Sequence, residues 1–210
     1  MDAFRREIHG WHSQRTGMHM PIVQYGHWGR PLLLLPTAAA DYLEAERKGL
    51  IDAVRKHIVA GKVRIFSIEG VNQHAWMNDS VSFPEKSARQ AAWVGYVEEE
   101  VVPYIRGCLQ NPAARLAIGG ASFGAFHAAN LFFRRPALWD TLLGMSGLYD
   151  LSSFLHGYSD EQVYLNNPAW FVPKLEDPKQ LELIRSAQIH IVTGQRSEEH
   201  TSELQSRYVI

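Results

Sequence analysis

The stretch Arg115-Leu-Ala-Ile-Gly-Gly-Ala-Ser-Phe-Gly-Ala-Phe-His-Ala-Ala-Asn130 decides the fold. Residues 115–119 are typical of a short buried strand, and residues 125–133 form an apolar, alanine-rich helical pattern. Between them, Gly120-Ala121-Ser122-Phe123-Gly124 fits G-x-S-x-G, in which the chain turns sharply from strand to helix and exposes a strained serine. The sequence therefore predicts a tight bend at Ser122.

The two glycines of this pattern have a steric purpose. Side chains two places before and two places after the serine would collide across such a turn, so both positions need glycine or another small residue. The pattern alone is only moderately specific, and an ordinary glycine-rich turn is the alternative interpretation. The buried strand before it and the apolar helix after it favour the strained bend.

Further strands and helices alternate along the chain. Apolar runs and amphipathic patterns predict strands at 32–35, 63–68, 142–146 and 188–193, and helices at 50–58, 84–109 and 177–186, with Pro103 kinking the second helix. Residues 6–26 suit an antiparallel meander at a sheet edge, and residues 152–174 suit an ordered insertion at the C-terminal ends of the strands. This alternation predicts an α/β fold with a mostly parallel sheet and helices on both faces.

Composition excludes several classes of protein. The chain has 210 residues, of which 46% are hydrophobic and 20% charged, and this predicts one globular domain. A net charge of -1 offers no basic surface for nucleic acid. No apolar run is long enough to span a membrane, and the N-terminus lacks a secretion signal, so we expect a cytoplasmic protein. The single Cys108 fits a core position, and the oligomeric state stays open.

An exposed serine at such a bend suits nucleophilic chemistry. Its hydroxyl needs a neighbouring imidazole to take the proton, and the oxyanion that forms needs N–H donors already in place. The backbone N–H of Phe123 is the first candidate donor. The second is expected in the loop after strand 32–35, where we favour Ala38, with Thr37 close behind. The alternative is that these small residues merely open the next helix.

Residues 119–130 resemble the nucleophile segment of the bacterial esterase family related to esterase D and to the antigen 85 acyltransferases. Segments 35–37, 98–105, 148–158 and 164–168 extend the resemblance over nearly the whole chain up to Gln195. It implies an α/β-hydrolase fold and a cofactor-free serine hydrolase that cleaves small carboxylic esters through a Ser, Asp/Glu, His triad. Gly124-Ala125 stands where many relatives have Gly-Gly or Gly-Tyr, a departure that leaves the elbow intact.

The C-terminal residues bear on the missing triad partners. Residues 196–206 resemble the in-frame translation of a common sequencing adapter, so we expect a truncated hydrolase domain at 1–195 and a non-native tail at 196–210. The catalytic histidine and acid would then lie beyond Gln195 in the natural chain, and the chain as given would have little activity. The alternative is that Glu198, Glu199 and His200 supply the triad, although an adjacent acid and base are hard to orient as a relay.

Other candidate partners for the serine are weaker. His127 should lie against neighbouring elements, His190 lies inside a predicted strand, and His74 follows one. No spacing among the ten histidines resembles a metal site. Asp150 could be a triad acid, but we favour the interpretation that it is the N-cap of a helical turn at 151–154.

Two further functions remain open from sequence. A non-catalytic relative could keep the fold to bind a ligand or partner, and an acyltransferase could use the same serine. The aromatic residues of the insertion indicate an apolar wall beside the site: Tyr158, Tyr164, Trp170 and Phe171.

Overall fold

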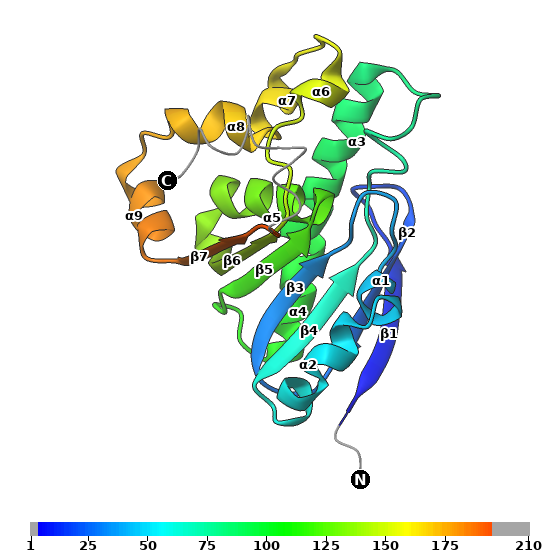
Figure 1. The fold of residues 1–210 in the computed structure, drawn as a ribbon, viewed down its shortest axis with the longest axis vertical. Helices are drawn as coiled ribbons and strands as arrows, with labels where there is room; N and C mark the ends of the chain where they lie inside the picture. Colours follow the sequence, from blue (N-terminus) through cyan, green and yellow to red (C-terminus); the bar gives the residue numbers. More distant parts are fainter. Residues whose placement is uncertain (1–3, 195–210) are drawn as a thin grey trace.

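The sheet runs in the order β1-β2-β4-β3-β5-β6-β7 through residues 4–194, the part of the chain that the computed structural model describes (Figure 1). Its strands are β1 (Arg6–His12), β2 (His19–Tyr25), β3 (Arg30–Leu35), β4 (Val63–Ile68), β5 (Leu116–Ala121), β6 (Trp139–Met145) and β7 (Gln188–Val192). The β1–β2 and β2–β4 pairs are antiparallel and every other pair is parallel. The predicted edge meander and mostly parallel sheet are therefore confirmed.

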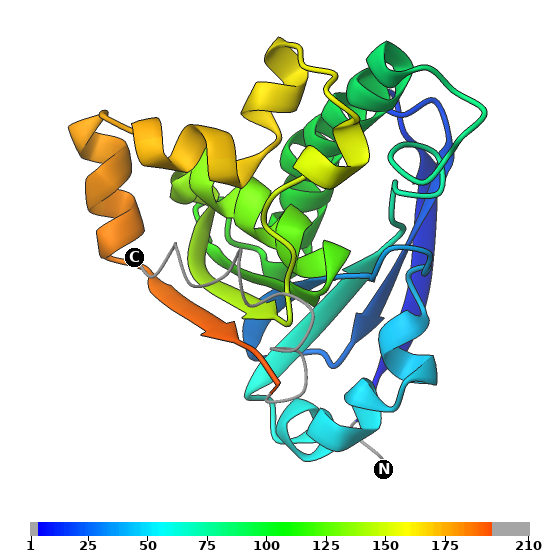
Figure 2. The same cartoon turned by 45° about the horizontal axis from the view of Figure 1, so that its top comes forward.

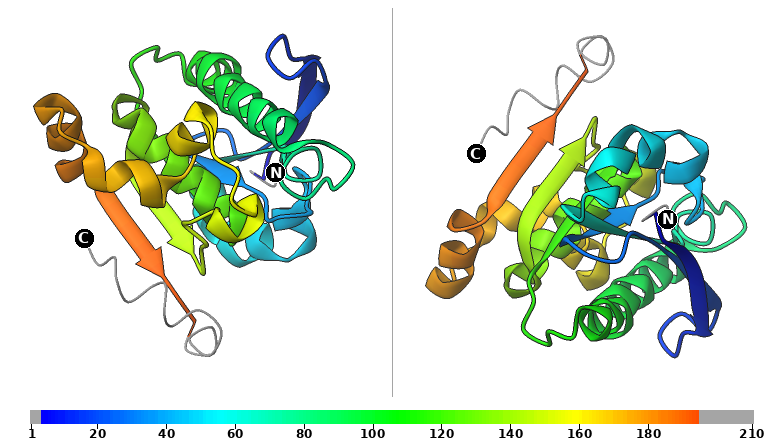
Figure 3. Two further views of the ribbon diagram at one scale, coloured as in Figure 1. Left: turned by 90° about the horizontal axis from the view of Figure 1, so that it is seen from above. Right: turned by 90° about the horizontal axis from the view of Figure 1, so that it is seen from below.

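Helices cover both faces of this sheet (Figure 3). The α-helices are α1 (Glu44–Arg47), α2 (Leu50–Val59), α3 (Phe83–Tyr96), α4 (Val102–Leu109), α5 (Phe123–Arg134), α6 (Ser152–Leu155), α7 (Glu161–Leu165), α8 (Pro168–Phe171) and α9 (Pro178–Arg185). Short 3-10 turns occupy Pro136–Leu138 and Val172–Lys174. Residues of α1 and α2 pack on one face, and those of α3, α4 and α5 pack on the other.

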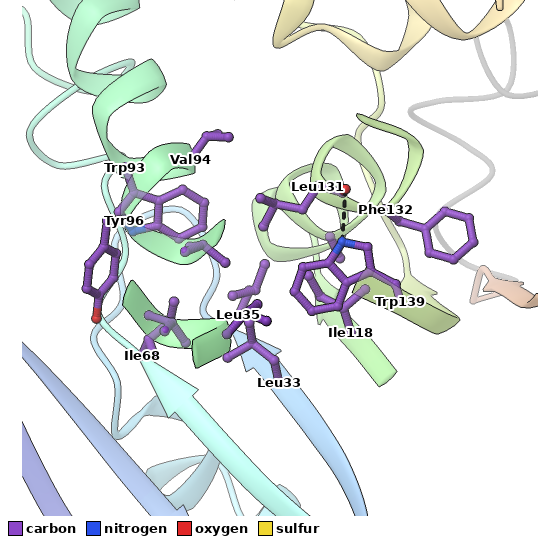
Figure 4. Close-up of a cluster of buried hydrophobic side chains, with 14 of the residues drawn as sticks. Leu33, Leu35, Ile68, Trp93, Val94, Tyr96, Ile118, Leu131, Phe132 and Trp139 are labelled. Carbon is purple, nitrogen blue, oxygen red and sulfur yellow. Dashed lines mark hydrogen bonds between the residues drawn. The ribbon is translucent and has the colours of Figure 1, made fainter. Parts of the chain in front are cut away.

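Strand β3 shows why the sheet is covered twice. Successive side chains of a strand point to opposite faces. Leu33 and Leu35 accordingly join the larger core with α3 and α5, whereas Leu34 joins the smaller core with α1 and α2. The larger core is shown in Figure 4, where the indole Nε1 of Trp139 donates to the Leu131 carbonyl at 3.0 Å. The predicted strand buried on both faces is present.

The predicted helix at 84–109 differs from the structure in its middle. Helices α3 and α4 are joined by a π-helical turn, Val97–Val101, so the helical path continues but the hydrogen-bond register changes. Pro103 lies just after this turn and has no N–H to donate to the carbonyl four residues earlier. The wider turn is a local way of accommodating that missing donor.

The insertion between β6 and β7 is ordered and helical. Helices α6, α7 and α8 follow one another across the top of the molecule, beyond α5 (Figure 2). Helix α7 contacts α3 and α8 contacts α5. No helix within residues 4–194 combines the length and apolarity that crossing a bilayer requires. The predicted tail at 196–210 lies outside the described residues.

Candidate active site

Ser122 stands alone between a strand and a helix. Strand β5 ends at Ala121 and helix α5 begins at Phe123, leaving Ser122 exposed with φ 54° and ψ −120°. Its amide donates to the carbonyl of Met145 on β6 at 3.0 Å, and its own carbonyl accepts the amide of Ala125 at 3.1 Å. The predicted bend is present, and it holds a hydroxyl at the surface in a backbone conformation that favours glycine.

Gly120, two residues before the serine, has no room for a side chain, because the backbone of Gly124 lies against it across the bend. A Cβ atom on Gly120 would lie 2.5 Å from the carbonyl carbon of Gly124, a distance that no side chain could adopt without moving the backbone. The strand can therefore pass directly into α5 only because Gly120 has no side chain, whereas a Cβ on Gly124 would meet the carbonyl oxygens of Leu35 and Pro36 instead.

Two backbone amides next to the serine have no hydrogen-bond acceptor in the described part of the chain. The N–H groups of Phe123 and Gly124 open helix α5, and neither donates to an acceptor within residues 4–194. Such N-terminal amides favour negative charge. Phe123, the first predicted oxyanion donor, is therefore placed beside Ser122 with its N–H uncommitted.

The second predicted donor lies on the loop after β3, and this loop passes next to the elbow. Gly124 packs against the carbonyls of Leu35 and Pro36. Ala38 packs against the apolar cluster that contains Phe123, and its N–H has no acceptor in the described part of the chain. The N–H of Thr37, by contrast, donates to Glu44 Oε2 at 2.8 Å. This geometry favours Ala38 over Thr37.

His127 is excluded as a base by its surroundings. It is 1% exposed, its Nε2–H donates to Asn72 Oδ1 at 3.0 Å, and its Nδ1 accepts from Gln90 Nε2 at 3.3 Å. Its ring packs on Trp93 with centroids 4.7 Å apart. Burial lowers the pKa of His127 to about 3, so the ring is neutral and serves the core. The predicted packing role is confirmed.

Asp150 is engaged within its own loop. Its Oδ1 accepts the backbone N–H of Ser152 at 2.9 Å, the Ser152 hydroxyl at 2.6 Å and Nδ2 of Asn167 at 2.9 Å. Burial raises the pKa of Asp150, but the hydrogen bonds from Asn167 and Ser152 lower it by more, so the net pKa lies below its usual value. The predicted N-cap is one residue off, because the cap position of α6 is Leu151.

The remaining candidate partners give no relay in the described chain. His74 is exposed in the loop after β4, and His190 is exposed on the edge strand β7. Glu198, Glu199 and His200 lie outside the described residues, as does any residue beyond Gln195.

The aromatic residues of the insertion divide between two cores. Tyr158 and Trp170 pack against the cluster of Trp76, Phe123, Phe126 and Leu151, whereas Tyr164 and Phe171 belong to the larger core under α5. Phe154, which sequence reasoning did not single out, lies edge-on to Phe123 with ring centroids 5.0 Å apart. Of the four aromatic residues predicted to form an apolar wall, Tyr158 and Trp170 therefore join the cluster that contains Phe123, the residue after Ser122, together with Phe154.

Two polar residues near the elbow were missed from sequence. Glu44 accepts two hydrogen bonds from Thr37 in the loop after β3, and its signal was a carboxylate seven residues after Thr37 at the start of a helix. Ser146 follows the β6 residue that pairs with Ala121, so it lies one strand from Ser122, exposed and at φ 44°. A serine directly after a buried strand was its only signal.

The chain was compared with known proteins. A family model described as "Putative esterase" matches residues 41–209. No curated protein matches the sequence.

Similar folds occur among solved structures. S-formylglutathione hydrolase of Staphylococcus aureus has a TM-score of 0.65 at 13% identity over 98% of this chain and 89% of that one. The corresponding enzyme of Agrobacterium tumefaciens has a TM-score of 0.66 at 13% identity over 92% and 87%. A ferulic acid esterase has a TM-score of 0.67 at 15% identity over 98% and 87%. At these identities the likeness shows a shared α/β-hydrolase fold, and because the family model matches most of the sequence, the chain belongs to the esterase family that this model describes.

Proposed function

We propose that this protein hydrolyses carboxylic esters through an acyl-enzyme on Ser122. The observation that carries the proposal is an exposed serine at φ 54°, between a buried strand and a helix whose first amides have no acceptor in the described chain. This combination supports nucleophilic attack, because the hydroxyl is accessible and the N–H donors are already oriented.

In the proposed reaction, Ser122 Oγ attacks the carbonyl carbon of the ester while a base takes the hydroxyl proton. The negative charge on the former carbonyl oxygen is stabilised by the N–H groups of Phe123 and Ala38. The carbon–oxygen bond to the leaving alcohol then breaks, and the protonated base gives its proton to that alcohol. A water molecule attacks the acyl-enzyme in the same way and releases the acid.

The base is proposed to come from outside the described residues. His127 is unsuitable because it is buried and its pKa is about 3. His9 pairs with Glu7 at 3.7 Å, but it lies on the edge strand β1, which β2, β4 and β3 separate from β5. We propose that the domain ends at residue 195 in this chain, that residues 196–210 are a non-native tail, and that the natural continuation carries the histidine and the acid. The chain as given would then have little activity.

The apolar wall bears on the choice of substrate. Phe154, Tyr158 and Trp170 pack in the same apolar cluster as Phe123, the residue after Ser122, and this supports an ester with an apolar or aromatic portion. Some structural neighbours act on such substrates by name, a ferulic acid esterase among them.

The test compares the natural full-length protein, its Ser122→Ala variant and the 210-residue chain. The full-length protein should turn over a short-chain nitrophenyl ester and take up a fluorophosphonate probe at Ser122, as detected by mass spectrometry of the labelled peptide. Ser122→Ala should lose both properties, and the 210-residue chain should lose turnover by several orders of magnitude. Turnover that survives in Ser122→Ala would refute the proposal. Product analysis with an added alcohol acceptor separates hydrolysis from acyl transfer.

A further inference from the structure

Both hydrogen-bond donors of Thr37 are bound by one carboxylate. The backbone N–H of Thr37 donates to Glu44 Oε2 at 2.8 Å, and its hydroxyl donates to Glu44 Oε1 at 2.6 Å. Hydrogen bonds to an ionised carboxylate are shorter and stronger than bonds between neutral groups. Paired in this way, they fix the orientation of the Thr37 peptide group as well as its position.

Helix α1, which begins at Glu44, is held against the sheet through Glu46. Two residues after Glu44, Glu46 Oε2 accepts the hydroxyl of Tyr25 at 2.7 Å and Nε of Arg6 at 2.7 Å. Tyr25 is fully buried on β2. Helix α1 is only one turn long, so these contacts with β1 and β2 supply the rigidity that so short a helix lacks.

The other side of the loop is held by the elbow. Gly124 lies against the carbonyls of Leu35 and Pro36, the two residues before Thr37. The loop is therefore fixed at its start by α5 and at Thr37 by α1. Beyond Thr37, the Ala40 amide donates to the Thr37 carbonyl at 3.4 Å, and the Ala39 carbonyl accepts from Gln73 Nε2 at 2.7 Å.

We propose that Glu44 is a positioning residue, which turns the Thr37 amide away from the serine and leaves the Ala38 amide as the oxyanion donor. The inference rests on the proposed function, because it assigns a task to the loop that faces the reacting oxygen. Within the described part of the chain, Glu44 accepts both hydrogen bonds of its carboxylate from Thr37 rather than from Ser122. Its contribution is the orientation of one peptide plane, to which stabilisation of an oxyanion is sensitive.

The test uses the natural full-length protein and a nitrophenyl ester. Glu44→Ala should lower kcat roughly 10- to 100-fold and change KM by less than about twofold, because the loop stabilises the transition state rather than the bound ester. A boronic acid, whose tetrahedral adduct mimics the oxyanion, should lose affinity by a similar factor. Glu44→Gln should retain activity within about threefold, because its carboxamide can accept from the Thr37 N–H and donate to the Thr37 hydroxyl.

A third variant and a control complete the design. Thr37→Val removes the hydrogen bond from the hydroxyl and keeps the one from the backbone N–H. We therefore expect kcat to fall roughly 3- to 10-fold, less than in Glu44→Ala. If Glu44→Ala fails to fold, Thr37→Val tests the proposal in its place. Asp52→Asn, an exposed change on α2, should leave kcat unchanged. Wild-type kcat in Glu44→Ala or Thr37→Val, or an effect confined to KM, would overturn the inference. If Ser122→Ala also stayed active, the proposed function itself would fail.

Discussion

A Cβ atom on Gly124 would lie 2.5 Å from the carbonyl oxygen of Leu35. The first turn of α5 therefore touches the backbone at the end of β3, and no flexible side chain lies between them to absorb a change. This contact joins the serine's elbow to the loop that carries the second proposed oxyanion donor, although the two segments are almost 90 residues apart in the sequence.

Gly124→Ala should strain both segments at once. We expect the free energy of unfolding to fall by about 1–3 kcal/mol, because the added methyl group meets backbone atoms on a packed interface. Urea denaturation measures the change. Gly107→Ala is the matched control: a Cβ there meets nothing within 4 Å, and the position lies inside helix α4. The control should be neutral or more stable by about 0.5–1 kcal/mol. Equal stability of Gly124→Ala and wild type would contradict the prediction.

The strain at Ser122 should be measurable without any substrate. Glycine adopts φ 54° and ψ −120° freely, whereas alanine and serine do so at a cost of about 1–3 kcal/mol. We expect Ser122→Gly to be more stable than Ser122→Ala by about 1 kcal/mol, after allowing for the greater freedom of glycine in the unfolded chain. Thermal and urea unfolding of the two variants test this, and the reverse order of stability would show that the bend is unstrained.

His127 should make stability depend on pH. Burial lowers its pKa to about 3 in the folded protein, whereas in the unfolded chain it remains near 6.5. The unfolded state therefore binds the proton first, and stability is lost as the pH falls from about 6.5 toward 3. When the pH is lowered from 7 to 5, we expect the free energy of unfolding to fall by roughly 1–2 kcal/mol because of this residue.

His127→Gln isolates this term. The variant should be less stable at pH 7, because Asn72 and Gln90 lose their partner, but its stability should change less between pH 7 and pH 5. His57→Gln, the same substitution at an exposed histidine of α2, is the matched control. If the stability of His127→Gln changed with pH as steeply as that of the wild type, the pH dependence would not come from His127.

Two neighbouring glutamates on the π-helical turn should differ in their contributions to stability. Glu100 accepts from Trp11 Nε1 at 2.6 Å, from the Ser13 hydroxyl at 2.8 Å and from the Arg15 amide at 3.1 Å, and so ties the β1–β2 hairpin to the helix. Glu99, by contrast, makes an exposed ion pair with Arg15 and no other side-chain hydrogen bond or ion pair within residues 4–194.

Glu100→Ala should therefore destabilise the protein by about 1.5–3 kcal/mol, because three donors lose a charged acceptor. Glu99→Ala should cost less than about 1 kcal/mol. Hydrogen exchange would locate the effect, with faster exchange of β1 and β2 amides in Glu100→Ala. If the two alanine variants were equally stable, the hairpin would be held by its apolar contacts alone.

Local patterns in the sequence were enough to predict most elements of the fold. The apolar run of β3, the amphipathic pattern of α2 and the alternation of strands and helices all reflect burial on one or two faces, which repeats every few residues. Pro103 marked the place where one helix is interrupted, but not that the chain would form a π-helical turn there. The short α1 gave no signal, because four residues are too few for a periodic pattern.

The candidate site was predictable only in part. The bend at Ser122 and the uncommitted Phe123 amide depend on sterics within five residues, so the sequence by itself determined them. The sequence favoured Ala38 as the second oxyanion donor, with Thr37 close behind. In our proposal that choice depends on Glu44, on the helix it opens and on the Tyr25 contact that holds this helix, and these contacts are set by packing between separate elements. The burial of His127 against α3 and the approach of Gly124 to Leu35 were likewise decided only by the tertiary structure, because contacts between distant segments leave no repeat in the sequence that could reveal them.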